Sequence, residues 1–460
     1  MNLLFDFLKH LSEKEKQKLA SLPLKGRSKE VWILLNQQAT KQDFDREKIE
    51  KTLGISSAHF DKITSQVLSR CYEHLYGDDG LALLGFLSER VTFVKHYYQE
   101  MKRQMSFAEK NFPRKQLTEF YKANVNFIHF NMPIIHKDEG VLKQLAEKYL
   151  AIEKDRKAQM LIECKLIFVQ IDKLFAAAQI QNKEASIQRQ LDKLGPLPTD
   201  ASEELAFAYY WLRIYFPAAL ERFEQAYSMT QEALTVLGRY SGKEKETHVL
   251  RIKLKEAEQL YYLSRFEQSF EKFTALMASS DAQALPDYSY YSTKYAQICF
   301  ITGHLQEAEI SLQNRQVIPL ESVKSIILPR DIISAAKYYI FSGKYEDAFD
   351  AIQLGFEKNP KGKYFQYEVE LRNLQTAYFY LTNQRKLAVQ VCNKHIKYLR
   401  SHGYGIRESD FPFFFVLTKS MHDKKERNKK LSAKEVAMLQ RYQLGSYAVY
   451  GKLLLKMLEA

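Results

Sequence analysis

The sequence predicts an all-α fold whose larger part is a solenoid of stacked helix pairs, and three observations lead to this prediction. The chain of 460 residues contains only 17 glycines and 11 prolines, fewer turn-forming residues than a sheet-rich protein needs. Strong helix formers such as Leu, Ala, Glu, Lys and Gln fill many windows of the sequence. A pattern of about forty residues also recurs after residue 200, and such a period is typical of helical repeats.

Residues 1–80 are expected to form a small N-terminal helical domain. The segment Leu53-Gly54-Ile55-Ser56, followed by Phe60 and Ile63, resembles a helix-turn-helix. Its glycine permits the left-handed turn between the two helices, and its apolar residues pack the second helix on the first. The run Gly77-Asp78-Asp79-Gly80 has strong turn chemistry and therefore marks the end of this domain.

The rest of the chain divides at a linker. Residues 81–198 carry apolar side chains at helical spacing and are expected to form helical hairpins, with degenerate repeats as an open alternative. The run Leu194-Gly195-Pro196-Leu197-Pro198 is the clearest linker in the sequence. Residues 199–402 are expected to form the repeat solenoid, and residues 403–460 to form C-terminal capping helices.

Four segments of the predicted solenoid share one pattern. A small residue is followed by an apolar residue, a turn, a large side chain, a second small residue and a further apolar residue. The third copy reads Ala336, Tyr339, Gly343, Tyr345, Ala348 and Ile352, and the four copies begin at Ala257, Ala296, Ala336 and Thr376, which are 39, 40 and 40 residues apart. One helix pair cannot bury its own apolar face, so the pattern predicts helix pairs that stack on their neighbours.

This pattern resembles the tetratricopeptide repeat family. Gly343, Tyr345, Ala348 and Pro360 stand at the spacings of that family's motif, whereas Ser264 and Asn383 replace the glycine in the first and fourth copies. The resemblance implies a right-handed α-solenoid in which the first helix of each pair lines a concave groove that binds a peptide. The groove positions that it implies are Arg251, Glu258, Tyr290, Thr293, Gln297, Arg330, Lys337 and Asn373.

Net charge and cysteine content indicate the kind of surface and the cellular compartment to expect. The formal net charge is +13, from 68 Lys and Arg against 55 Asp and Glu. Because this charge is spread along the chain, it indicates a solubilising surface and only permits binding to nucleic acid. The 4 cysteines lie far apart, which is typical of buried thiols in a reducing compartment. With neither a signal-peptide pattern nor a membrane-spanning run, the expected location is the cytoplasm.

No motif in the sequence supports catalysis. The sequence contains no phosphate-binding glycine loop, nucleophile elbow or HExxH motif. His129 and His136 are seven residues apart with Pro133 between them, which is not the spacing of a metal site. We therefore expect no enzyme activity, no cofactor and no resident metal.

Two functions follow from these patterns. The first is a non-catalytic scaffold or adaptor that binds a protein or peptide in its groove. The alternative is a DNA-binding transcriptional regulator, since the layout also resembles bacterial proteins with an N-terminal helix-turn-helix-like module. In that alternative, His59, Lys62 and Gln66 of the second helix would face the major groove. The sequence indicates no membrane partner and leaves the oligomeric state open.

Overall fold

The computed structural model describes residues 3–41, 44–76, 101, 104–105, 108–135, 139–176, 180–242, 244–285, 287–319, 329–359, 365–401, 411–426, 430–444 and 448–459. Every regular element in these ranges is a helix, which confirms the all-α prediction. The chain forms two compact units, Met1–Lys173 with Ser186–Gly195 and Leu174–Ala185 with Pro196–Ala460. One boundary between the two units, between Gly195 and Pro196, therefore lies inside the segment that the sequence indicates as a linker.

The first unit contains short helices in its N-terminal part and longer ones after them. Its helices are α1 (Leu3–His10), α2 (Glu13–Leu19), α3 (Gly26–Lys41), α4 (Arg46–Leu53), α5 (Ser57–Tyr76), α8 (Arg114–Ile135) and α9 (Glu139–Ile152), with most of α10 (Arg156–Ala176) and α11 (Ile180–Leu194). Helices α1, α3 and α5 pack on one another. The buried side chains of Phe7, Val31, Phe60 and Leu145 belong to one apolar core, so helices α1 to α5 share their core with later helices of this unit.

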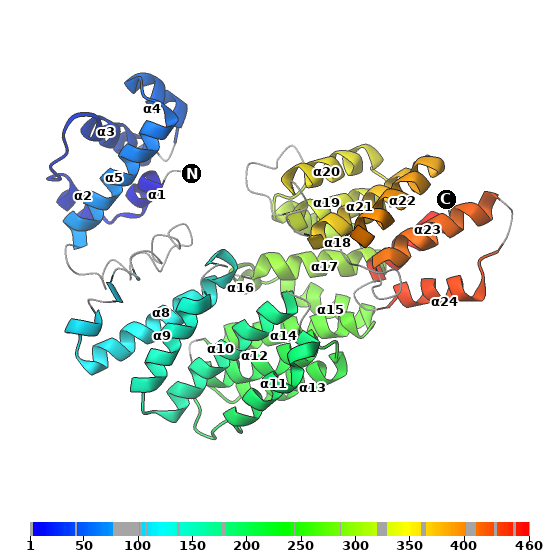
Figure 1. The fold of residues 1–460 in the computed structure, drawn as a ribbon, viewed down its shortest axis with the longest axis horizontal. Coiled ribbons are helices and arrows are strands. Elements are labelled where there is room, and N and C mark those ends of the chain that lie inside the picture. Colours follow the sequence, from blue (N-terminus) through cyan, green and yellow to red (C-terminus); the bar gives the residue numbers. More distant parts are fainter. Residues whose placement is uncertain are drawn as a thin grey trace. The chain divides into compact units, whose positions relative to one another are not determined.

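The second unit is a series of helices that pack in sequence order. They are α12 (Glu203–Ala219), α13 (Phe223–Leu237), α14 (Lys245–Tyr262), α15 (Phe266–Met277), α16 (Ser280–Gln283), α17 (Tyr288–Thr302), α18 (Leu305–Asn314), α19 (Pro329–Ser342), α20 (Tyr345–Lys358), α21 (Phe365–Leu381), α22 (Arg385–Ser401), α23 (Phe411–Glu426), α24 (Ala433–Tyr442) and α25 (Ala448–Glu459). From α12 to α23 the long helices contact their neighbours along the chain, as Figure 1 shows. This arrangement is consistent with a helical repeat fold.

Five helix pairs of the second unit share one turn. In each, the first or second residue after the first helix has a left-handed backbone. The N–H of the residue that follows it bonds to the carbonyl five residues earlier, as in a Schellman motif. The left-handed residues are Glu221, Ser264, Gly303, Gly343 and Asn383, with φ of 61°, 62°, 86°, 77° and 62°. Four of these are the turn positions of the repeat pattern, so the recurrence corresponds to a recurring backbone conformation.

The second small residue of the pattern is fully buried in every pair. At this position stand Ala226, Ser269, Ala308, Ala348 and Ala388, each with an exposure of 0%. A small side chain allows the two helices of a pair to approach closely, and the large side chains on either side fill the remaining space. The pair α12–α13 follows the same rule although its sequence departs from the pattern.

The left-handed turns give a stability prediction with an internal control. Ser264→Gly should raise the free energy of unfolding by about 1 kcal/mol, because a side chain in this conformation costs about 1–2 kcal/mol and glycine avoids that cost. Gly343→Ala should lower it by about 1 kcal/mol. A Cβ atom at Gly343 would meet no other atom within 4 Å, so this cost comes from the backbone alone. Urea unfolding of the two variants checks both signs, and two changes of the same sign would contradict the shared turn.

Candidate functional site

The predicted groove residues lie on a row of first helices. This first-helix row consists of α12, α14, α17, α19 and α21, each of which contacts the next helix of the row. The C-terminal helix α25 packs against α17 and α21 of the row. In addition, Lys456 of α25 donates a hydrogen bond of 3.1 Å from Nζ to the backbone oxygen of Phe341 in α19. The later part of the row is therefore covered by a helix of the same chain.

Lys337 and Asn373 lie under this helix. Both are 3% exposed. The Nζ atom of Lys337 lies 2.6 Å from Oε2 of Glu370, and Tyr450 of α25 donates its hydroxyl to the same carboxylate at 2.8 Å. The side-chain oxygen of Asn373 is buried and has no hydrogen-bond partner among the described residues. Burial acts to raise the pKa of Glu370, but the Lys337 ammonium, the Tyr450 hydroxyl and the charge of Lys294 together lower that pKa below its ordinary value. These polar side chains connect α25 to the row.

Glu258 and Tyr290 form a second buried cluster. Glu258 is 2% exposed, and its carboxylate lies 2.5 Å from Nζ of Lys255. The hydroxyls of Tyr290 and Tyr262 also donate to it. Burial acts to raise the pKa of Glu258, whereas the charges of Lys255 and Lys294 lower it, and the net shift is downward. The carboxylate is therefore ionised and paired inside the chain.

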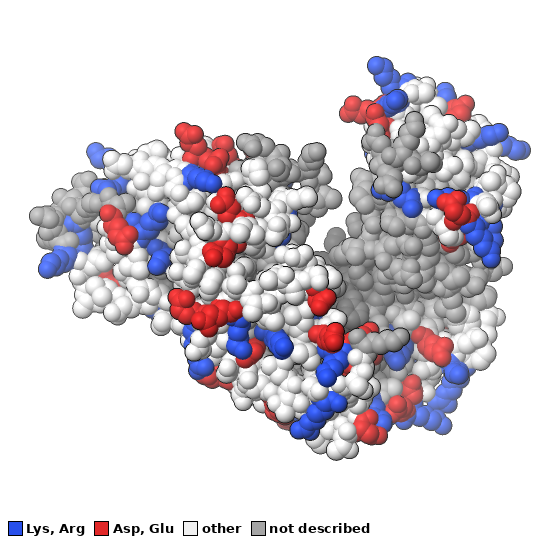
Figure 2. Space-filling model, turned by 180° about the vertical axis from the view of Figure 1, so that it is seen from behind, with Lys and Arg blue, Asp and Glu red and all other residues white. Residues whose placement is uncertain are grey.

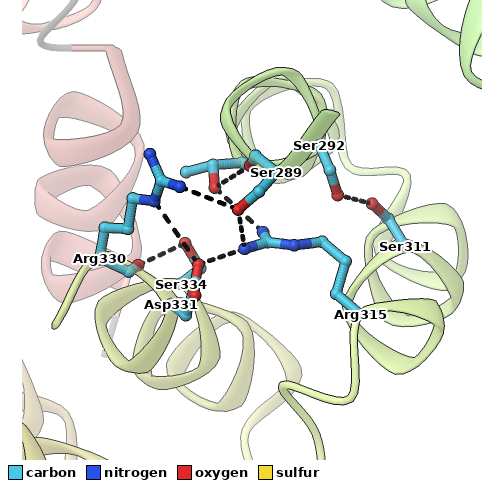
Figure 3. Close-up of polar contacts among 8 residues, drawn as sticks. Ser289, Ser292, Ser311, Arg315, Arg330, Asp331 and Ser334 are labelled. Carbon is cyan, nitrogen blue, oxygen red and sulfur yellow. Dashed lines mark hydrogen bonds and ion pairs between the residues drawn. The ribbon is translucent and has the colours of Figure 1, made fainter. Parts of the chain in front are cut away.

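Thr293 of α17 and Arg330 of α19 belong to a third cluster. Figure 3 shows the surroundings of Arg330 in this cluster. Arg330 donates to the hydroxyl of Ser289 at 2.9 Å, and Arg315 donates to the same hydroxyl at 2.8 Å. Arg315 also bonds Thr293 at 3.0 Å and pairs with Asp331. Because Arg315 is almost fully buried, this cluster connects α17 to α18 and α19 and supports the fold.

Arg251 lies where the row carries aromatic side chains. Its guanidinium is 3.0 Å from Oδ2 of Asp287 and lies over the ring of Trp211, 4.9 Å from the centroid. Gln297, the remaining predicted residue, is half-buried. The sequence interpretation missed Trp211, Lys255 and Lys294. The sequence does contain a signal for the two lysines, because Lys255 and Lys294 each follow a predicted groove residue by one helical turn.

The helix-turn-helix candidate has the local geometry expected from its sequence. Helices α4 and α5 are joined at Gly54, whose φ is 60°, and Ile55 donates its N–H to the Glu50 carbonyl at 3.1 Å. Phe60, Ile63 and Val67 of α5 are buried. On the other side of the helix, the predicted DNA-facing residues are exposed: His59, Lys62 and Gln66.

Glu50 is a bulky residue near the turn, and polar contacts accommodate it. Arg46 of the preceding turn lies 2.5 Å from its Oε1, and the Ser57 hydroxyl donates to its other oxygen at 2.9 Å. The hydrogen bond from Arg46 lowers the pKa of Glu50. Arg46 also bonds the backbone oxygen of Ser57 and pairs with Asp61, so charged groups hold α4 to the start of α5.

The face of the molecule drawn in Figure 2 shows no single dominant charge. In the face drawn in Figure 2, positive and negative side chains are interspersed. Within the described residues, no three His, Cys, Asp or Glu side chains gather as a metal site would require. No helix in the described part of the chain is long and apolar enough to cross a membrane.

The isolated cysteines are buried, and burial raises the pKa of Cys71, Cys299 and Cys392 to about 12. These thiols therefore stay protonated at neutral pH and have low nucleophilicity.

Comparison with known proteins adds no relative: no protein-family model matches the chain, and no curated protein matches it at a significant level.

Proposed function

We propose that this protein is a non-catalytic scaffold that binds a segment of another protein on its first-helix row. The observation that carries the proposal is that α25 lies on this row against α17 and α21. A surface that binds one helix of the chain has the shape and apolar character to bind another, as helix-in-groove recognition requires. On this view the second unit is a tetratricopeptide-like, right-handed solenoid that works in the cytoplasm.

The test is affinity purification of partners with the full chain and two variants. Arg251→Ala/Trp211→Ala alters half-buried side chains in the part of the row that α14 and α12 form. Lys386→Ala, on α22 outside the row and exposed, is the control. We expect the double variant to lose partners that the control retains. Lys337 is unsuitable for this test because it is buried against Glu370, and its loss would change stability as well as binding.

The exposed face of α5 favours a second candidate function, in which the first unit binds DNA. His59, Lys62 and Gln66 lie on one exposed face of a helix that follows a left-handed glycine turn, as residues of a recognition helix do. The protein would then be a transcriptional regulator whose second unit senses the partner.

DNA binding by the full chain should depend steeply on salt if this second function is correct. We expect Lys62→Ala to weaken binding to duplex DNA and to reduce the slope of log affinity against log salt by about 1, because one phosphate contact is lost. Lys14→Ala, an exposed lysine on α2, should leave the slope unchanged. Fluorescence anisotropy at two salt concentrations measures both. If the unmodified chain shows no binding at low salt, the DNA function is wrong.

A further inference from the structure

The part of the first-helix row formed by α12, α14 and α17 carries aromatic and cationic side chains together. We call it the cation–aromatic strip, with these members: Phe207, Trp211, Tyr215, Arg251, Lys255, Tyr290 and Lys294. We propose that this strip binds an acidic, partly apolar peptide segment of a partner protein, and that Lys294 receives one of its carboxylates. The proposal rests on the proposed scaffold function and names the chemistry of the partner.

The aromatic members supply the apolar contacts. Phe207, Trp211 and Tyr215 follow one another at intervals of four residues on α12 and are half-buried. Cations lie over their rings: Arg251 is 5.4 Å from the Phe207 centroid and 4.9 Å from that of Trp211, and Lys255 is 5.4 Å from that of Trp211. Half-buried aromatic rings in a row are typical anchors of protein interfaces, in which Trp, Tyr and Arg dominate the binding energy.

One of the three cationic members has no carboxylate as a direct ion-pair partner. Arg251 pairs with Asp287 at 3.0 Å, and Lys255 pairs with Glu258 at 2.5 Å. Lys294 has no ion pair among the residues that the structure describes, and its Nζ atom donates to the hydroxyl of Tyr262 at 2.8 Å. The three cations thus have two carboxylates in direct ion pairs, and Arg251, Lys255, Lys294, Asp287 and Glu258 together carry a charge of +1. The charge of Lys294 lowers the pKa of Glu258 and of Glu370, but Lys294 forms a direct ion pair with neither in the part of the chain that the structure describes.

The surroundings of Lys294 would strengthen a bond to a carboxylate. Its Nζ atom lies 4.9, 5.5 and 5.7 Å from the ring centroids of Tyr262, Tyr261 and Tyr290. These rings and the half-burial of the side chain exclude much of the surrounding water, and ion pairs are stronger where water is excluded. One unpaired cation among aromatic rings favours a peptide over nucleic acid, whose binding depends on several exposed cations that contact phosphates.

The fluorescence of Trp211 can report peptide binding at the strip in solution. The only other tryptophan is Trp32, in the first unit, so a full-length Trp32→Phe variant reports on the strip alone. The probe is a capped twelve-residue peptide of Leu, Phe, Ala and Glu, and its matched versions carry Gln or Lys in place of every Glu. We expect the acidic peptide to change the Trp211 emission saturably and to bind about tenfold more tightly than the Gln peptide, a gain of about 1.4 kcal/mol from one charge-assisted contact.

Variants of Lys294 test whether this residue sets the preference. In Lys294→Met the acidic and Gln peptides should bind equally, whereas Lys294→Arg should keep the preference. Lys253→Met changes an exposed lysine of the same row and should keep the preference for the acidic peptide over the Gln peptide. Circular dichroism checks that each variant is folded. Equal binding of the acidic and Gln peptides to the unmodified strip, or absence of binding by the acidic peptide, would overturn this inference. The scaffold function is tested separately by affinity purification, and it is wrong if Arg251→Ala/Trp211→Ala retains the same partners as the unmodified chain.

Discussion

Lys337→Met is expected to lower the free energy of unfolding by about 2–3 kcal/mol. This is less than the usual cost of about 3–5 kcal/mol for removing one partner of a fully buried ion pair, because the Glu370 side chain is 29% exposed. Lys337 is 3% exposed and pairs with Glu370 at 2.6 Å. Without the ammonium, the Glu370 carboxylate must stay charged without its ion-pair partner, with only the more distant charge of Lys294 acting on it, or take up a proton, and both cost free energy. Urea unfolding of the second unit, within the full chain, measures the change.

The double variant Lys337→Met/Glu370→Leu should recover most of this loss. Replacing both partners of a buried pair with apolar side chains of similar size is often close to neutral. Tyr450 would lose its hydrogen bond to Glu370, so a part of the loss should remain. If the double variant is as unstable as the single one, the loss comes from the packing of Lys337 and not from its charge.

Acidification from pH 6.5 to pH 5 should cost about 2 kcal/mol of stability through His395 alone. Burial, with the nearby charges of Arg372 and Lys394, lowers the pKa of His395 from 6.5 to about 3. Between these two values the unfolded chain binds a proton that the folded chain does not, so stability falls as the pH falls. The ring lies against Phe415, 5.0 Å between centroids, and 3.5 Å from the Thr376 hydroxyl, where an imidazolium would be poorly solvated.

His395→Gln isolates this effect. Between pH 6.5 and pH 5, the number of protons that the chain takes up on unfolding should be smaller by about one in this variant, because glutamine does not titrate. The free energy of unfolding should therefore depend less steeply on pH. His59→Gln changes an exposed histidine and should leave the dependence as it is. Urea unfolding at several pH values gives the slopes, and an unchanged slope in His395→Gln would show that this histidine does not remain neutral in the folded chain.

The repeat pattern predicted local structure well because local chemistry produces it. Gly303 and Gly343 mark left-handed turns, and aligning the copies placed Ser264 and Asn383 at the same conformation. Glu221 also adopts it, but a glutamate carries no turn signal in a sequence. Its conformation is imposed by the packing of α12 on α13, which overrides the local backbone preference.

The candidate site was predictable only in part. The spacing placed Arg251 and Tyr290 on the first helices, and both belong to the cation–aromatic strip. The same spacing could not show that Lys337 and Asn373 are buried, since a position on a helix face does not reveal what covers that face. Their polarity suggested an exposed groove, whereas Lys337 pairs internally with Glu370 and Asn373 is buried with its side-chain oxygen unpartnered among the described residues.

The sequence by itself determined the all-α class, the recurring turns and the close helix crossings, because each depends on residues less than about one repeat apart. The tertiary structure alone decided which part of the first-helix row is occupied. The helix α25 and its contacts in α17 and α21 are far apart in the chain, and burial of apolar side chains is not directional. Which apolar faces meet depends on the packing of the whole second unit, which no local pattern encodes.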